Sequence, residues 1–270
     1  MQVRIEGTAL DRWIRRIVER ALFDKVMVGN AASRTEILRL VRSVVPVAVP
    51  GGLVRIGPPG DGGYLMPDDL EGIAACLSPG VSNECGFDLA VAERGIPVIL
   101  ADASVAGPPT AHRLFDFIPK FLDVVPGERT LTIEEMARPA PAGDLLLQMD
   151  IEGAEYRVLT SMSDDLLRRV RIAVIEFHEL DQMFSRFGYS TIAAAFAKLT
   201  RHHSVVHIHP NNNSAPVRRG DISVLPLMEF TFYRRDRFTP SGEPVSYPHP
   251  LDACCVPSRP AQALPECWQA

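Results

Sequence analysis

From residue 53 onward, short apolar runs alternate with segments of helical pattern, and this alternation constrains the fold more than any other feature of the chain. Helices are predicted around residues 85–94, 130–137, 153–168 and 189–201. The predicted strands are Leu53–Gly57, Tyr64–Met66, Ile73–Leu77, Val98–Ala101, Leu145–Met149, Ile172–Phe177, Val205–Ile208 and Phe230–Tyr233. Strands that alternate with helices indicate an α/β fold on a mostly parallel sheet.

The segments on either side of this core differ from it. Residues 1–52 are predicted as a helical lead-in, with an amphipathic helix over 8–22 and a second helix over 33–45 that begins at a capping box, Ser33 with Glu36. Residues 239–270 hold seven of the 23 prolines and are predicted as an irregular tail, wrapped over the domain or partly disordered. We therefore divide the chain into 1–52, a core of 53–238, and 239–270. The N-terminal helices are the natural place for contact between two copies in a homodimer.

Composition argues against some kinds of binding partner and some cellular compartments. The net charge is −5 and no long Lys/Arg run occurs, which argues against a nucleic-acid partner. We find no run of about 18 apolar residues, and the first 30 residues carry charges throughout, so neither a membrane span nor a signal peptide is expected. Five cysteines without a C-x-x-C pair favour free thiols in a reducing cytoplasm over disulfides or a structural zinc site.

A glycine turn and an acidic residue follow the first two core strands. Gly80 begins the turn, and Asp102 lies 22 residues farther along, at the end of the next strand. In open α/β sheets this pair suits a nucleoside cofactor, because glycine admits close approach and the carboxylate accepts hydrogen bonds from ribose hydroxyls. An ordinary turn and a helix-capping aspartate are the alternative. The chain contains neither G-x-G-x-x-G nor a P-loop motif.

Carboxylates and histidines follow the later strands. Asp150 comes where a strand gives way to a helix. Glu176 and His178 share a face by strand alternation, as do His207 and His209. Imidazole is suited to proton removal near neutral pH, and Asp, Glu and His together also suit a divalent cation. A single histidine on a strand is more often a core residue, but several such groups at adjacent strand ends favour a functional site.

Several motifs together resemble the FkbM family of S-adenosylmethionine-dependent O-methyltransferases, over roughly residues 53–235. These motifs are Asp61-Gly62-Gly63-Tyr64, the Gly80 turn followed by Phe87-Asp88, Asp102, and above all Met149-Asp150-Ile151-Glu152-Gly153-Ala154-Glu155. The resemblance implies a Rossmann-like, seven-stranded, mostly parallel sheet of the class I methyltransferase type with a reversed last hairpin. It also implies methyl transfer to a hydroxyl, often on a sugar of a natural product or surface glycan.

The resemblance also implies roles for particular residues. The methionine end of S-adenosylmethionine would lie along Gly80, Val81, Ser82 and Glu84, its ribose at Asp102 with Ala103 beside it, and the methyl-transfer centre at Asp150. Ser82 stands where the commoner methyltransferase pattern has a glycine.

Two schemes for activating the acceptor hydroxyl stay open. The candidates for a general base are His178, then His209, then Asp150. A divalent cation such as Mg²⁺, held by Asp150, Glu176 and His178, would instead lower the pKa of the hydroxyl. A metal-dependent hydrolase using the same groups, and a binding module without catalysis, are the competing function classes. The glycine turn and ribose-type aspartate favour the methyltransferase.

Overall fold

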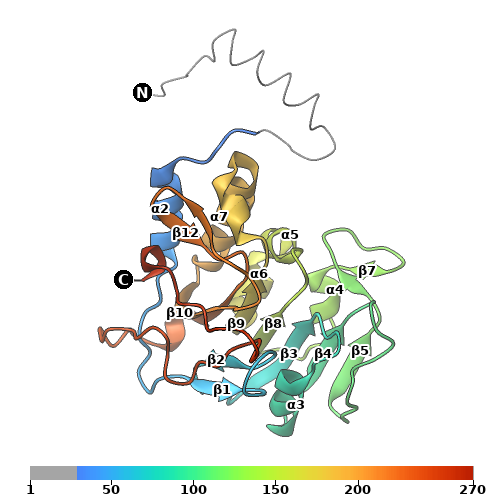
Figure 1. The fold of residues 1–270 in the computed structure, drawn as a ribbon. Helices are drawn as coiled ribbons and strands as arrows, with labels where there is room; N and C mark the ends of the chain where they lie inside the picture. Colours follow the sequence, from blue (N-terminus) through green and yellow to red (C-terminus); the bar gives the residue numbers. More distant parts are fainter. Residues whose placement is uncertain (1–28, 270) are drawn as a thin grey trace.

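A mixed sheet forms the centre of the computed structural model, which describes residues 29–269. Within that range the sheet has seven strands in the order β10-β13-β9-β8-β3-β4-β5 (Figure 1). They are β3 (Ile73–Pro79), β4 (Val98–Ala101), β5 (Phe115–Ile118), β8 (Asp144–Met149), β9 (Val170–Phe177), β10 (His203–Pro210) and β13 (Met228–Arg234). β13 is antiparallel to both of its neighbours, and the other pairings are parallel. The predicted Rossmann-like sheet with a reversed last strand is confirmed.

Each face of the sheet has its own apolar core. Helices α2 (Arg34–Ser43), α4 (Ile133–Ala137), α5 (Glu155–Ser161), α6 (Asp164–Arg169) and α7 (Arg186–Leu199) cover one face. Helix α3 (Gly86–Glu93) and the hairpin of β1 (Val54–Ile56) and β2 (Tyr64–Met66) cover the other. Alternate residues of β9 enter the two cores, with Ile175 in the first and Val174 in the second. Glu176 therefore lies on the face under the β1–β2 hairpin.

Of the helices predicted from residue 33 onward, all but one form as single helices, with different ends. The Ser33–Glu36 capping box begins α2 as expected. The prediction of a single helix over 153–168 is wrong, because helix α5 ends at Ser161. Ser163 then caps a second helix, α6, by accepting a hydrogen bond from the Leu166 N–H. α7 begins three residues before the predicted helix, because Ser185 caps it in the same way through the Gly188 N–H.

Some short strands were not predicted. β5 forms the edge of the central sheet, and its half-exposed residues give only a weak alternating pattern at Phe115 and Phe117. The others pair in two small sheets, β6 (Phe121–Leu122) with β7 (Thr130–Leu131), and β11 (Val217–Arg219) with β12 (Ile222–Val224). Short 3₁₀ turns, η1 (Leu180–Phe184) and η2 (Arg235–Arg237), complete the described elements before residue 239.

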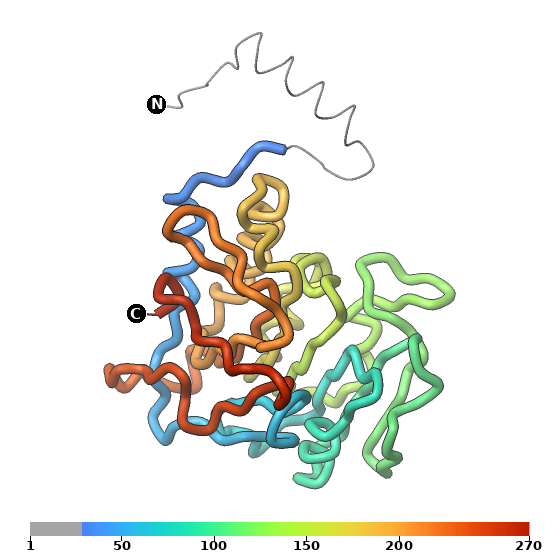
Figure 2. The backbone as a smooth tube through the Cα atoms, viewed as in Figure 1, coloured from blue at the N-terminus to red at the C-terminus, as the bar shows by residue number. Residues whose placement is uncertain are grey.

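The proline-rich tail wraps over the domain, one of its two predicted arrangements (Figure 2). From residue 239 to 269 its one helical element is η3 (Glu266–Trp268). Trp268 is fully buried, its ring packs edge-on against Phe230, and its indole N–H donates to the Ser223 carbonyl at 3.2 Å. The tail is therefore anchored at its end by a large apolar contact.

Two predictions about the flanks stay untested. The helix predicted over 8–22, and any dimer contact through it, lie outside the described residues. The division at residues 52 and 238 also stays a prediction. Among residues 29–269, none of the helices has both the length and the apolar character that membrane crossing requires.

Candidate active site

The ends of β3 and β8 meet without space for a side chain between them. The Asp150 N–H donates to the Pro79 carbonyl at 3.2 Å. Gly80 follows with a φ of +95°, and a Cβ placed on it would lie 1.5 Å from the Asp150 carbonyl oxygen. Glycine is therefore required at residue 80, both for its backbone conformation and for this approach.

Asp102 organises the loop beside that junction. Its Oδ2 accepts a hydrogen bond from the Ser82 N–H at 2.8 Å, and its Oδ1 accepts from the Ser104 N–H and hydroxyl at 2.7 and 2.6 Å. A carboxylate offers about four acceptor positions, so one position on Oδ2 is left for a ligand hydroxyl. The buried carboxylate thus shapes the turn through three hydrogen bonds and keeps one acceptor position.

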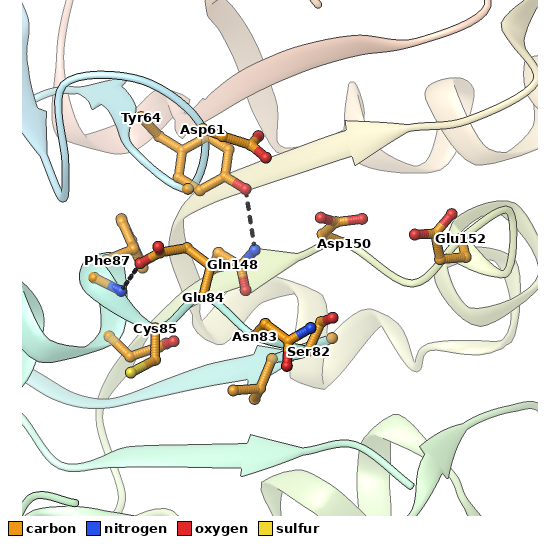
Figure 3. A pocket seen from close by; sticks show the side chains of 15 residues that line it. Asp61, Tyr64, Ser82, Asn83, Glu84, Cys85, Phe87, Gln148, Asp150 and Glu152 are labelled. Atoms are coloured by element: carbon orange, nitrogen blue, oxygen red, sulfur yellow. Dashed lines mark hydrogen bonds between the residues drawn. The ribbon is translucent and has the colours of Figure 1, made fainter. Parts of the chain in front are cut away.

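Two cavities adjoin at this junction. The first, about 290 Å³, extends from the Gly80 turn toward Asp61 and Tyr64 (Figure 3). The second, about 420 Å³, extends past Asp102 toward β6 and β7. The residues that line both are Gly80, Ser82, Asp150 and Glu152. The two cavities therefore adjoin along these four residues, and we refer to them together as the path, with Asp150 at the joint.

The structure brings most of the predicted cofactor residues to this path. The first cavity contains Gly80, Val81, Ser82, Glu84 and Asp150 in its lining, and the second contains Asp102. Ala103 lines neither of them. Its carbonyl instead accepts a hydrogen bond from the Arg129 guanidinium at 3.0 Å.

Other residues of these cavities were not predicted as site residues. Gln148 lines the first cavity, where its amide N–H donates to the Tyr64 hydroxyl at 3.3 Å (Figure 3). Its side-chain carbonyl accepts a hydrogen bond from the Ser78 hydroxyl at 2.8 Å. In the second cavity, Asp123 accepts from Arg157 at 2.9 Å. Asp61, Tyr64, Phe87, Asp88 and Glu152 had a signal in the sequence, because they belong to the motifs that resemble the FkbM family.

His178 lies beside the joint, held by a buried glutamate. Glu155, at the start of α5, accepts hydrogen bonds from the Ile151 and Gly153 N–H groups at 3.1 Å each. The same Oε1 atom lies 3.1 Å from the His178 Nδ1. A carboxylate there favours the tautomer with a proton on Nδ1, which leaves a lone pair on Nε2.

The free ring nitrogen of His178 faces two more carboxylates. Nε2 lies 3.7 Å from Asp150 Oδ1 and 3.4 Å from Glu152 Oε2. Burial lowers the pKa of His178, but its bond to Glu155 and the nearby carboxylates outweigh burial, so the net pKa is raised. Burial raises the pKa of Asp150, and the attraction of His178 offsets only part of that rise. Both groups therefore keep their protons to a higher pH than they would in water.

The predicted metal set of Asp150, Glu176 and His178 does not assemble as such. At the joint, the side chains whose ligand atoms lie within 4.8 Å of one another are those of Asp150, Glu152 and His178. Glu176 lies on the sheet face, where its carboxylate accepts from the Asn211 amide at 2.7 Å. His178 comes after the last residue of β9, so strand alternation no longer fixes its direction.

The structure separates His209 from Asp150 and His178. His207 and His209 do share a face, with parallel rings whose centroids are 6.4 Å apart. Both approach Asp252 of the tail, at 3.0 Å and 3.4 Å respectively. His209 lines neither of the two joined cavities. Its predicted role as a base at the transfer centre therefore has no geometric support.

The path lies at the carboxyl ends of parallel strands, the edge at which open α/β sheets bind their ligands. Residues 100–196 match the family model described as the methyltransferase FkbM domain. The matched segment includes Asp102, Asp150 and His178. The match confirms the resemblance to the FkbM family and supports an S-adenosylmethionine-dependent methyltransferase. No curated protein matches the chain.

Solved structures show a distant likeness only. A methyltransferase from Anabaena variabilis, described as dependent on S-adenosylmethionine, is 8% identical, with a TM-score of 0.31, over 60% of this chain and 77% of its own. A candidate RNA methyltransferase from Pyrococcus horikoshii is also 8% identical, with a TM-score of 0.29, over 75% of this chain and 99% of its own.

The contact between Gly80 and Asp150 can be tested with a matched pair of variants. Gly80→Ala and Gly95→Ala both place a side chain at a positive φ, but a Cβ at Gly95 meets nothing within 4 Å. We expect Gly80→Ala to lower the free energy of unfolding by about 1–3 kcal/mol more than Gly95→Ala, because only the former forces the strand ends apart. Urea denaturation of both variants measures this difference. Equal losses would show that the two strand ends can separate freely.

Proposed function

We propose that this protein transfers a methyl group from S-adenosylmethionine to a hydroxyl of a small molecule, with sugars as the substrate class. The observation that supports this most strongly is the joint of the two cavities at Asp150, with the Nε2 of His178 facing it. One cavity would hold the nucleoside part of the cofactor, and the other would admit the acceptor. The family match favours methyl transfer over the metal-dependent hydrolase suggested by the same side chains.

The residues along the path fit this cofactor. Asp102 keeps one acceptor position for a ribose hydroxyl, and the turn at Gly80 and Ser82 lets the backbone approach the ligand closely. Val81 and Glu84 lie farther along the same turn, where the methionine end would bind. When bound, the cofactor supplies a methyl group activated by a positively charged sulfonium. Asp150 and Glu152 offer that charge a matching negative field.

The first cavity has the character of a site for polyhydroxy compounds. Asp61, Glu84, Asp88 and Asp150 supply carboxyl groups to its lining, and Tyr64 supplies an aromatic ring. Carboxylates accept hydrogen bonds from sugar hydroxyls, and they fix the orientation that an in-line transfer needs. An amine would also suit an acidic cavity, so the choice between oxygen and nitrogen acceptors is the part to test.

His178 is our proposed general base. Its Nε2 would accept the proton of the acceptor hydroxyl, and Glu155 would stabilise the resulting imidazolium through Nδ1. The alternative is a divalent cation such as Mg²⁺ at Asp150, Glu152 and His178, which would lower the pKa of the hydroxyl instead. The two schemes differ in whether a chelator abolishes the reaction.

Replacing His178 tests the base. We expect His178→Ala and His178→Gln to reduce methyl transfer by roughly 10²–10⁴-fold, because neither side chain accepts a proton, while affinity for S-adenosylhomocysteine stays near normal. The assay follows tritium-labelled methyl transfer to panels of free sugars, nucleotide sugars and matched amines, with and without chelator. His112→Ala, outside both cavities, is the control.

Two results would contradict the proposal. Full activity in His178→Gln, whose amide can still bind Glu155, would show that His178 has only a structural role. Transfer to the amines with none to the hydroxyl compounds would make the enzyme an N-methyltransferase.

The pH profile tests how Glu155 acts on His178. A base works when deprotonated, so the rate should fall as pH drops through the His178 pKa, which the structure raises above 6.5. Glu155→Gln keeps an acceptor for the backbone N–H groups but removes the negative charge. We expect the midpoint of the rate profile to move to lower pH in this variant. An unchanged midpoint would show that the His178–Glu155 pair does not cause the pH dependence of the rate.

A further inference from the structure

We propose that His209, Glu229 and Cys255 bind a zinc ion that fastens the C-terminal tail to the sheet. One ligand atom from each of these residues lies within 4.8 Å of the other two. This site shares no residue with the Asp150–His178 joint. It does not depend on the proposed methyl transfer.

Two of the ligands come from paired strands and one from the tail. His209 of β10 and Glu229 of β13 are direct partners in the sheet, so their side chains share a face. The Cys255 thiol reaches this face from the tail and lies 3.2 Å from Glu229 Oε1. Glu229 is 6% exposed and Cys255 7%. A bound ion would therefore be enclosed by protein on at least two sides.

One buried ring nitrogen in this group has no hydrogen-bond partner among the described residues, the Nε2 of His209. Buried polar atoms are normally paired, so this nitrogen offers a position for a ligand. The other ring nitrogen of His209, Nδ1, lies 3.4 Å from Asp252 Oδ1, and the Nε2 of His207 lies 3.0 Å from the same oxygen. A proton on Nδ1 shared with Asp252 would leave Nε2 free to bind the metal, the usual arrangement of a histidine ligand.

The acidic surroundings of Glu229 also favour a cation. Glu229 is the direct sheet partner of Glu176, and both are buried on the same face. Like charges opposite one another are unfavourable, and within residues 29–269 neither glutamate forms an ion pair with lysine or arginine. A dication would compensate this charge directly.

The donor atoms of His209, Glu229 and Cys255 favour zinc over other divalent cations. A thiolate, an imidazole and a carboxylate suit Zn²⁺, whereas Mg²⁺ and Ca²⁺ prefer oxygen alone. A neutral His209, an ionised Glu229 and a Cys255 thiolate would together balance the charge of Zn²⁺. Burial raises the pKa of the Cys255 thiol, and the metal would displace its proton on binding. Three protein ligands leave the fourth position to water.

Neighbouring cysteines provide a matched test. The purified protein is loaded with Zn²⁺, dialysed against metal-free buffer, and its metal content measured. Cobalt loading is measured in parallel, because a thiolate ligand gives a thiolate-to-cobalt charge-transfer band. We expect one zinc per chain and this band in the wild type and in Cys254→Ser, which lies outside the group. Cys255→Ser should lose the band and the retained zinc.

Further variants keep the proposal falsifiable if Cys255→Ser fails to fold. Glu229→Gln should weaken zinc retention, and Asp252→Asn should weaken zinc affinity by roughly 10–100-fold, because Asp252 orients His209. Folded wild-type protein that retains no zinc, or a charge-transfer band that persists in Cys255→Ser, would overturn the proposal. Binding of S-adenosylhomocysteine should be the same in all folded variants, which separates this test from that of the methyltransferase.

Discussion

The contact between Gly80 and the backbone of Asp150 is the constraint on which the rest of the site depends. A side chain at residue 80 would overlap the Asp150 carbonyl oxygen, so β3 and β8 can end this close together only because a glycine is present. That approach directs the Ser82 N–H to Asp102 and leaves Asp150 at the joint of the two cavities. The two cavities therefore adjoin at this single backbone contact.

The two ends of the sheet differ in whether their buried ionisable groups have a partner of opposite charge. At the amino end of β9, the buried Arg171 guanidinium is bound by the carboxylates of Asp69 and Asp144. At the carboxyl ends, Asp150 and Glu176 meet no lysine or arginine in the described part of the chain, and burial raises the pKa of both carboxyl groups. Groups with perturbed pKa values cluster at functional sites. This contrast favours the carboxyl edge of the sheet as the functional one, without appeal to a family resemblance.

Local patterns in the sequence predicted many of the strands and turns. They could not predict contacts between segments that are distant in the chain. The apolar run at Leu145–Met149 and the glycine at residue 80 marked their strand and turn correctly, because both depend on residues adjacent in the chain. The exposed edge strand at Phe115–Ile118 gave too weak a pattern. The pairing of His178 with Glu155, and the approach of Cys255 to Glu229, arise only when the chain folds back on itself.

Calorimetric titration of the wild-type protein with S-adenosylhomocysteine, with and without Mg²⁺, is the most direct test of the cofactor site. We expect saturable binding of one molecule per chain. At 100 times the dissociation constant, this binding would raise the free energy of unfolding by about 2.7 kcal/mol. Binding that is independent of Mg²⁺ is expected if His178 alone serves as the base. Folded protein that shows no saturable binding in either buffer would contradict the assignment of Gly80, Asp102 and Asp150 to a cofactor site.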